Sequence, residues 1–146
     1  MGSIGWHRSM FLLSWLICLL AGFSASCNTL GGEKQNEEGL LLAVDRFNKD
    51  LRWEDFKSAS ALIDSAAKEK FWDEADRLHA TVRIVDYQIV DTDVDGYAAN
   101  VTLRFRFYQK QNPQVQTRTL HQQWLFSEKD RAWRVVKDDV RKLMPD

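Results

Sequence analysis

The segment Tyr97-Ala-Ala-Asn-Val-Thr-Leu-Arg-Phe-Arg-Phe-Tyr108 alternates apolar and polar residues without a break. Because successive side chains of a β-strand point to opposite faces of its sheet, this period of two predicts a strand with one buried and one solvated face. The buried row would run from Tyr97 to Phe107, and Arg104 and Arg106 would lie on the opposite face. This strand therefore serves as the reference for predicting the neighbouring elements of the fold.

The flanking segments keep the same period and predict three more strands. On the N-terminal side, the alternation that starts at Ala80 slips once between Ile84 and Val85, which predicts a β-bulge. Asp, Asn, Gly and Pro, which favour turn conformations, separate the strands. We therefore predict a four-stranded antiparallel meander, with turns at 93–96, 112–113 and 127–130, a third strand over 114–127 and a fourth strand that carries Trp133 and Val135.

Before Ala80 the apolar residues recur at the spacing of helices. The clearest pattern is carried by four residues at intervals of four, three and four: Leu40, Val44, Phe47 and Leu51. It predicts an amphipathic helix that starts at Glu37, and shorter patterns predict helices over about 53–63 and 66–78. Helices followed by antiparallel strands form an α+β domain, so we expect N-terminal helices packed on one face of a curved sheet.

This arrangement resembles the nuclear transport factor 2-like superfamily, also called the SnoaL-like or cystatin-like roll. The resemblance covers about residues 37–137 and is carried by the helix ending at Leu51, the Trp53-Glu-Asp-Phe56 start of the second helix and the hairpin Trp124-Leu-Phe-Ser-Glu-Lys-Asp-Arg-Ala-Trp-Arg-Val-Val136. Members include isomerases, dehydratases and transport factors. The resemblance therefore implies a fold but not one function.

Enzymes of this type place carboxylates, Tyr or His at inward positions of a cone, where desolvation raises the pKa of an acid. The inward positions that we assign as pocket lining are Tyr87, Tyr97, Gln122 and Trp124. The inward row from Tyr97 to Phe107 contains no acid, so we assign no catalytic residue. A cofactor-independent isomerase or dehydratase is the alternative to a non-enzymatic binding domain.

Charge and reactive side chains argue against several other classes. The 146 residues carry 20 Lys and Arg against 21 Asp and Glu, so we expect no nucleic-acid binding. After the first 26 residues, only His79 and His121 could serve as imidazole ligands, too few for zinc. The run Asp91–Gly96 resembles the start of a calcium loop, but Thr102 replaces the bidentate Glu. We therefore expect no bound metal. The chain also contains no Gly-rich phosphate-binding loop, so we expect no cofactor.

The first 26 residues have the features of a secretory signal peptide. Arg8 gives a positive start, and the apolar run Met10–Phe23 is shorter than the roughly 20 residues that span a bilayer. Phe23-Ser-Ala-Ser-Cys27 resembles the lipobox of bacterial lipoproteins, which implies cleavage before Cys27 and its acylation with chains such as palmitate. Cys18 would leave with the signal, so Cys27 has no disulfide partner in the mature chain.

The segment after this cysteine predicts the membrane to which the protein is attached and a linker to the folded domain. In bacterial lipoproteins an Asp after the Cys favours the inner membrane, so Asn28 implies the periplasmic side of the outer membrane. Residues 28–36 are polar and contain a Gly pair. This composition predicts a flexible tether between the lipid on Cys27 and the folded domain. The domain itself would occupy residues 37–146.

Three arginines are assigned to the open sheet face as an interaction surface: Arg104, Arg106 and Arg118. Arg is favoured at protein interfaces, so this face could bind a second copy of the chain or another envelope protein. The sequence thus predicts a lipid-anchored, non-enzymatic envelope domain that binds a partner protein or a small apolar ligand.

Overall fold

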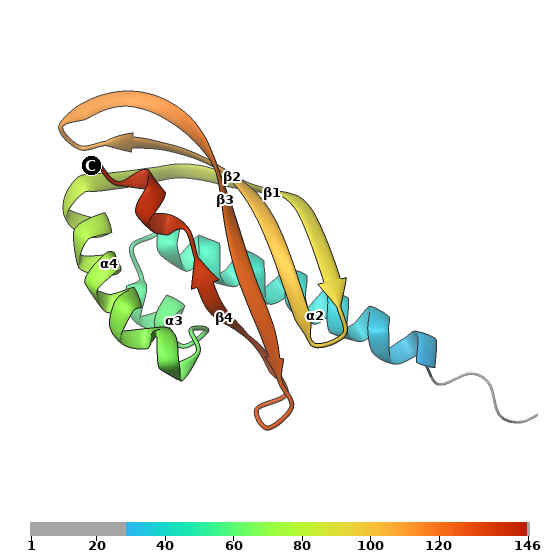
Figure 1. The fold of residues 1–146 in the computed structure, drawn as a ribbon. Helices are drawn as coiled ribbons and strands as arrows, with labels where there is room; N and C mark the ends of the chain where they lie inside the picture. The colour runs from blue at the N-terminus through green and yellow to red at the C-terminus, as the bar shows by residue number, and fades with distance from the viewer. Residues whose placement is uncertain (1–28, 146) are drawn as a thin grey trace, which may run out of the picture. The chain divides into compact units, whose positions relative to one another are not determined.

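The computed structural model describes the backbone of residues 29–145 and the side chains of residues 37–145 (Figure 1). The predicted signal peptide and Cys27 lie outside the described residues. The chain divides into two units, residues 1–34 and 35–146, and the fold below is that of the second. No helix among the described residues has both the length and the apolar character needed to cross a bilayer.

Among the described residues, four helical segments precede the sheet: α2 (Thr29–Arg52), α3 (Phe56–Ser60), the 3-10 turn η1 (Ser65–Ala67) and α4 (Lys68–Thr81). Helix α2 buries the predicted stripe, including Phe47 at 0% exposure. It begins at Thr29 rather than at Glu37, so the helix takes in residues 29–36, for which a tether was predicted. The segment 33–36 contains Glu, Lys and Gln, which favour helix, and an existing helix extends more easily than a new one forms.

The second helix is shorter than predicted because a turn precedes it and a strand-like contact follows it. Glu54 has a positive φ of 60°, which ends α2, and the Asp55 carboxylate caps α3 through the Ser58 N–H at 3.1 Å. After α3 the chain extends, and Ile63 forms a parallel bridge with Val135. The segment 53–63, which was predicted to be one helix, therefore contains the short helix α3 and, at Ile63, a β-bridge to β4.

The strands are β1 (Val82–Asp95), β2 (Ala98–Gln109), β3 (Asn112–Ser127) and β4 (Ala132–Asp138), followed by the 3-10 turn η2 (Val140–Leu143). They pair antiparallel in the order β1-β2-β3-β4, which confirms the predicted meander. The predicted bulge lies between Ile84 and Asp86, and a second one lies between Ile89 and Asp91. Gly96, at φ 57°, makes the first hairpin turn.

The helices pack on one face of the curved sheet, as predicted (Figure 1). Phe47 of α2 lies with its ring centroid 5.8 Å from Trp124 of β3 and 6.2 Å from Phe71 of α4. The inward row of β2 fills the centre of this core: Val101, Leu103, Phe105 and Phe107. The C-terminal turn η2 closes one end of the core with buried Val140 and Leu143.

Candidate functional site

The sheet face opposite the helices, here called the open face, carries the two arginines at the centre of β2. Arg104 and Arg106 are exposed, whereas the residues beside them in the strand are buried. In register, Arg104 lies opposite Thr119 of β3 and Arg106 lies opposite Thr117. The open face therefore presents basic and hydroxyl side chains to solvent.

Arg118 does not belong to the open face, which corrects the sequence analysis. It lies opposite Phe105 in the register, and directly opposite residues share one face of a sheet. Its guanidinium is 5.7 Å from the centre of the Phe107 ring, and it donates to the backbone oxygen of Lys142. Arg118 has the same strand parity as buried Leu120, so it projects to the side on which the helices pack.

Gln122 and Trp124 point inward, but the domain's own side chains surround them. Gln122 is 2% exposed and Trp124 is 0% exposed. The Gln122 amide donates to Asn48 Oδ1 at 2.9 Å, and the Asn48 amide donates to Gln122 Oε1 at 3.3 Å and to the Val44 carbonyl at 2.7 Å. The Trp124 indole N–H donates to Gln122 Oε1 at 3.3 Å. These buried polar groups form hydrogen bonds with one another, so they stabilise a packed interior.

The two tyrosines assigned to a pocket have different surroundings. Tyr87 is partly buried and its hydroxyl donates to Asp45 of α2, 2.8 Å from Oδ1. Burial, followed by this hydrogen bond, raises the pKa of Tyr87 above its ordinary value. Tyr97 is 57% exposed and precedes β2, so it lies at the exposed end of the inward row and not inside the core. Its ring stacks on Phe126 at 5.8 Å, and the assignment of Tyr97 to an inner pocket is wrong.

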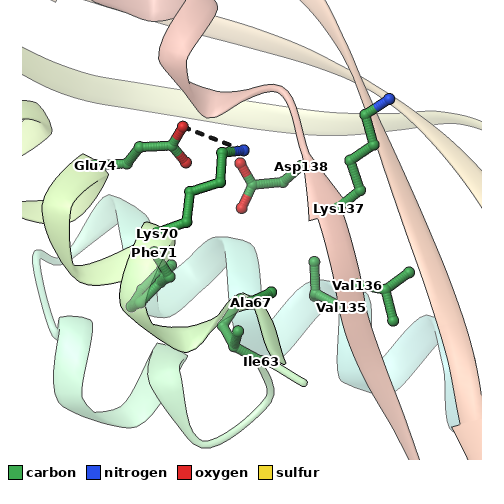
Figure 2. A pocket seen from close by; sticks show the side chains of 9 residues that line it. All are labelled: Ile63, Ala67, Lys70, Phe71, Glu74, Val135, Val136, Lys137 and Asp138. Atoms are coloured by element: carbon green, nitrogen blue, oxygen red, sulfur yellow. Dashed lines mark ion pairs between the residues drawn. The ribbon is translucent and has the colours of Figure 1, made fainter. Parts of the chain in front are cut away.

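A small pocket between α4 and the end of β4 gathers several charged side chains (Figure 2). Its volume is about 30 Å³, and it is lined by Ile63, Ala67, Lys70, Phe71, Glu74, Val135, Val136, Lys137 and Asp138. Glu74 is 8% exposed, and its Oε1 lies 3.3 Å from Lys70 Nζ. Burial raises the pKa of Asp138 to about 6, against the opposing hydrogen bond from the Val140 N–H, and the charge of Glu74 adds to the rise.

With a pKa of about 6, Asp138 could hold or release a proton near neutral pH, but the space beside it is small. Ligand pockets usually measure about 300–1,000 Å³. A second, shallow groove of about 190 Å³ lies beside the β3–β4 turn and is also polar; its lining residues are Ala61, Ile63, Asp64, Ser65, Lys68, Ser127, Asp130 and Arg134. Neither of these two cavities includes the side chains assigned to a pocket from the sequence.

A second charged cluster surrounds Glu54, where the backbone takes its positive φ. Glu54 Oε2 lies 2.8 Å from His79 Nδ1, and Oε1 accepts from Arg83 at 2.8 Å and lies 3.8 Å from Lys110 Nζ. Burial alone would raise the pKa of Glu54, but the Arg83 hydrogen bond and the charge of Lys110 lower it. Glu54 thus ties the end of α2 to α4 and to one end of the β1–β2 pair, where β1 begins and β2 ends.

Sequence reasoning missed both clusters. Lys70 and Glu74 stand four residues apart in a predicted helix, which is a recognisable ion-pair spacing. Asp138 and Glu54 gave no such signal, because their partners are distant in sequence. Among the described residues, no group of three or more His, Cys, Asp and Glu side chains could hold a metal ion.

Comparison with known proteins bears on the fold alone. No protein-family model and no curated protein sequence matches this chain. A ketosteroid isomerase-like protein from Erwinia carotovora atroseptica superposes with a TM-score of 0.58 at 12% identity, over 69% of this chain and 91% of that one. A dehydratase-type protein of the nuclear transport factor 2-like family from Streptomyces avermitilis gives 0.56 at 15%, over 73% and 94%.

A third structure, a protein with a cystatin-like fold from Nostoc punctiforme, superposes with a TM-score of 0.51 at 11% identity, over 70% of this chain and 86% of that one. These likenesses, together with the observed topology, show the nuclear transport factor 2-like or cystatin-like α+β fold. The identities are too low to carry an activity from those proteins to this one.

Proposed function

We propose that this chain is a non-enzymatic binding domain, anchored at the bacterial envelope by a lipid on Cys27, that binds a protein partner through its open face. The observation that carries the proposal is the packed interior. Gln122 and Trp124 were expected to line the cone of the fold. Instead, Trp124 is hydrogen-bonded to Gln122, and Gln122 is hydrogen-bonded to Asn48. Recognition would then use the surface, and the open face offers two exposed arginines.

The lipid anchor is supported by the sequence of the N-terminal segment. An apolar run too short to span a bilayer leads to Cys27, and Asn28 favours the periplasmic side of the outer membrane. Several acyl chains, at about 0.8 kcal/mol per buried CH₂, would hold the domain stably. The partner of the open face would be an envelope protein or a second copy of the chain.

The test uses the full chain extracted from its own envelope and examined by native mass spectrometry. We expect wild type in the membrane fraction with an associated protein mass, and Cys27→Ser in the soluble or uncleaved fraction. Arg104→Glu/Arg106→Glu should lose the associated mass by about tenfold or more, because like charges across an interface are costly. The matched control is Lys57→Glu/Arg77→Glu, the same charge change on exposed residues of α3 and α4.

Two results would contradict the proposal. Equal recovery of the associated mass by the open-face and control variants would mean that the arginines are only solvated surface. Membrane partitioning of Cys27→Ser after removal of the signal peptide would contradict the lipid anchor. Either result leaves the fold unaffected, because both variants change exposed or N-terminal positions.

The second candidate is a small acid–base enzyme of the isomerase or dehydratase type. Asp138, with a pKa near 6 beside Glu74 and Lys70, is the group that favours it. It would be supported by a small apolar molecule retained in native mass spectra, and by loss of that molecule in Asp138→Asn. A protein that carries no such molecule favours the binding domain.

A further inference from the structure

The first half of β3 has a neighbouring strand on one side only. β4 pairs with β3 from Gln122 to Ser127, whereas β2 pairs with it along almost its whole length. Within residues 29–145, no strand therefore pairs with the other side of β3 between Asn112 and His121. Figure 1 shows the β2–β3 hairpin (orange) running well past the end of β4.

The register identifies the backbone groups on this edge. Residues of a regular antiparallel strand direct their N–H and C=O groups alternately to one side and the other. The Phe126 N–H donates to the Tyr97 oxygen at 2.8 Å, on the β2 side. The His121 N–H donates instead to the Asp139 carboxylate, beyond the end of β4. Odd-numbered residues thus face the edge, and Thr117 and Thr119 present their N–H and C=O groups there.

Three arginines border these two threonines, from both faces of the sheet. Arg104 and Arg106 lie directly across the sheet from Thr119 and Thr117 on the open face. Arg118 lies between the threonines on the other face, next to η2. The arginines that the sequence analysis assigned to one face are therefore divided between two faces, yet they surround one short edge.

The acids near this edge already have partners among the described residues. Asp139 accepts from Lys142 at 2.6 Å, and Asp86, opposite Arg106 on β1, lies 3.9 Å from Arg52. Both Thr117 and Thr119 are exposed. An unpaired edge of this kind can bind an extended segment, with main-chain hydrogen bonds giving affinity and alternate side chains giving specificity.

We propose that the Thr117–Thr119 edge of β3 takes up an extended, acidic segment of a partner protein as an added strand. The segment would exchange backbone hydrogen bonds with the two threonines. Its carboxylates would face Arg104 and Arg106 on one side and Arg118 on the other. The inference deepens the proposed function and rests on it for the role of Arg104 and Arg106, because it names the chemistry and the docking mode of the partner.

The experiment uses the full chain in detergent micelles and a capped eight-residue peptide of Glu, Val and Thr. A peptide of the same order with Lys in place of Glu is the charge control. Hydrogen exchange is followed by mass spectrometry over fragments that cover residues 116–120. We expect the acidic peptide to slow exchange of the Thr117 and Thr119 amides by about tenfold or more, since added hydrogen bonds must open before exchange. The Lys peptide should leave their exchange unchanged.

Two variants of one residue separate backbone recognition from charge. Thr119→Pro removes an N–H that points away from β2 and should weaken peptide binding by about tenfold. Thr119→Val keeps that N–H and should bind as wild type does. Protection located elsewhere on the wild-type chain, or equal binding by the two variants, would overturn the added strand. Loss of partner association in Arg104→Glu/Arg106→Glu would still support the proposed function in that case, so the two failures are distinguishable.

Discussion

The two halves of β3 show how strongly burial depends on the number of neighbouring strands. From Gln122 to Ser127 the strand has β4 on one side and β2 on the other, and its inward side chains Gln122 and Trp124 are at most 2% exposed. From Asn112 to His121 only β2 pairs with it, and almost every residue except Leu120 is exposed. Both halves are β-strand with alternating side chains.

This difference separates strand formation from core formation. β-propensity and hairpin pairing are enough to extend the strand to Asn112, where few apolar residues are available to bury. Within β3, the buried side chains Leu120, Gln122 and Trp124 lie in the half that β4 pairs with or close beside it. This half of β3 therefore contributes more to the core, while the unpaired half leaves backbone groups for recognition.

Replacing Trp124 in the paired half should produce the largest loss of stability. Trp124→Ala removes a fully buried indole that packs against Phe47, and large-to-small changes of this kind cost about 3–5 kcal/mol. Val115→Ala, at a side chain that is 48% exposed in the unpaired half, should change stability by less than about 0.5 kcal/mol. Urea unfolding of both variants measures the difference, and equal losses would remove the distinction between the halves.

Local periodicity predicted most of the fold but not where its rows begin and end. The unbroken alternation before Tyr108 placed Arg104 outside and Phe105 inside, as observed. It failed at Tyr97 because the row ends there at the edge of the core, so the ring stacks on Phe126 but stays 57% exposed. Arg118 was assigned to the wrong face although it shares parity with Leu120, so the signal was present in the sequence.

The charged clusters could not be predicted from local pattern. Asp138 meets Glu74 because β4 ends beside α4, a contact between residues 64 positions apart in the chain. The open edge of β3 depends likewise on β4 stopping at Asp138, where the chain turns into η2. Such features arise from the lengths of distant elements, which propensity and periodicity do not specify.

Asp138 lies at the boundary between the two halves, opposite Gln122, and its ionisation should oppose folding. Its pKa in the folded domain is raised from 3.8 to about 6. The folded state therefore binds this proton more tightly than the unfolded chain, so the contribution of Asp138 to stability is greatest below about pH 4 and is lost as the pH rises to about 6. Asp138→Asn should abolish this decline and be more stable than wild type at pH 7.5 by about 1–3 kcal/mol.

Urea unfolding between pH 4.5 and 7.5 measures this effect, with Asp139→Asn as the control of opposite sign. The Lys142 hydrogen bond and charge lower the pKa of Asp139 although burial acts to raise it, so Asp139→Asn should lose stability at pH 7.5. A wild-type slope that persists in Asp138→Asn would mean that another group binds the proton.

Only a small effect on stability is expected at Arg118, in the unpaired half. Arg118→Met keeps an aliphatic contact with Phe107 but loses the guanidinium above the ring and the hydrogen bond to the Lys142 oxygen. Exposed cation–π contacts contribute about 0.5–1 kcal/mol, so urea unfolding should show a loss below about 1 kcal/mol.

An inward-pointing charge on an edge strand also discourages unwanted pairing. We therefore expect Arg118→Met to self-associate more than wild type in sedimentation experiments, and Arg118→Lys to remain like wild type. A stability loss of Trp124→Ala size at Arg118 would instead show that the unpaired half supports the core.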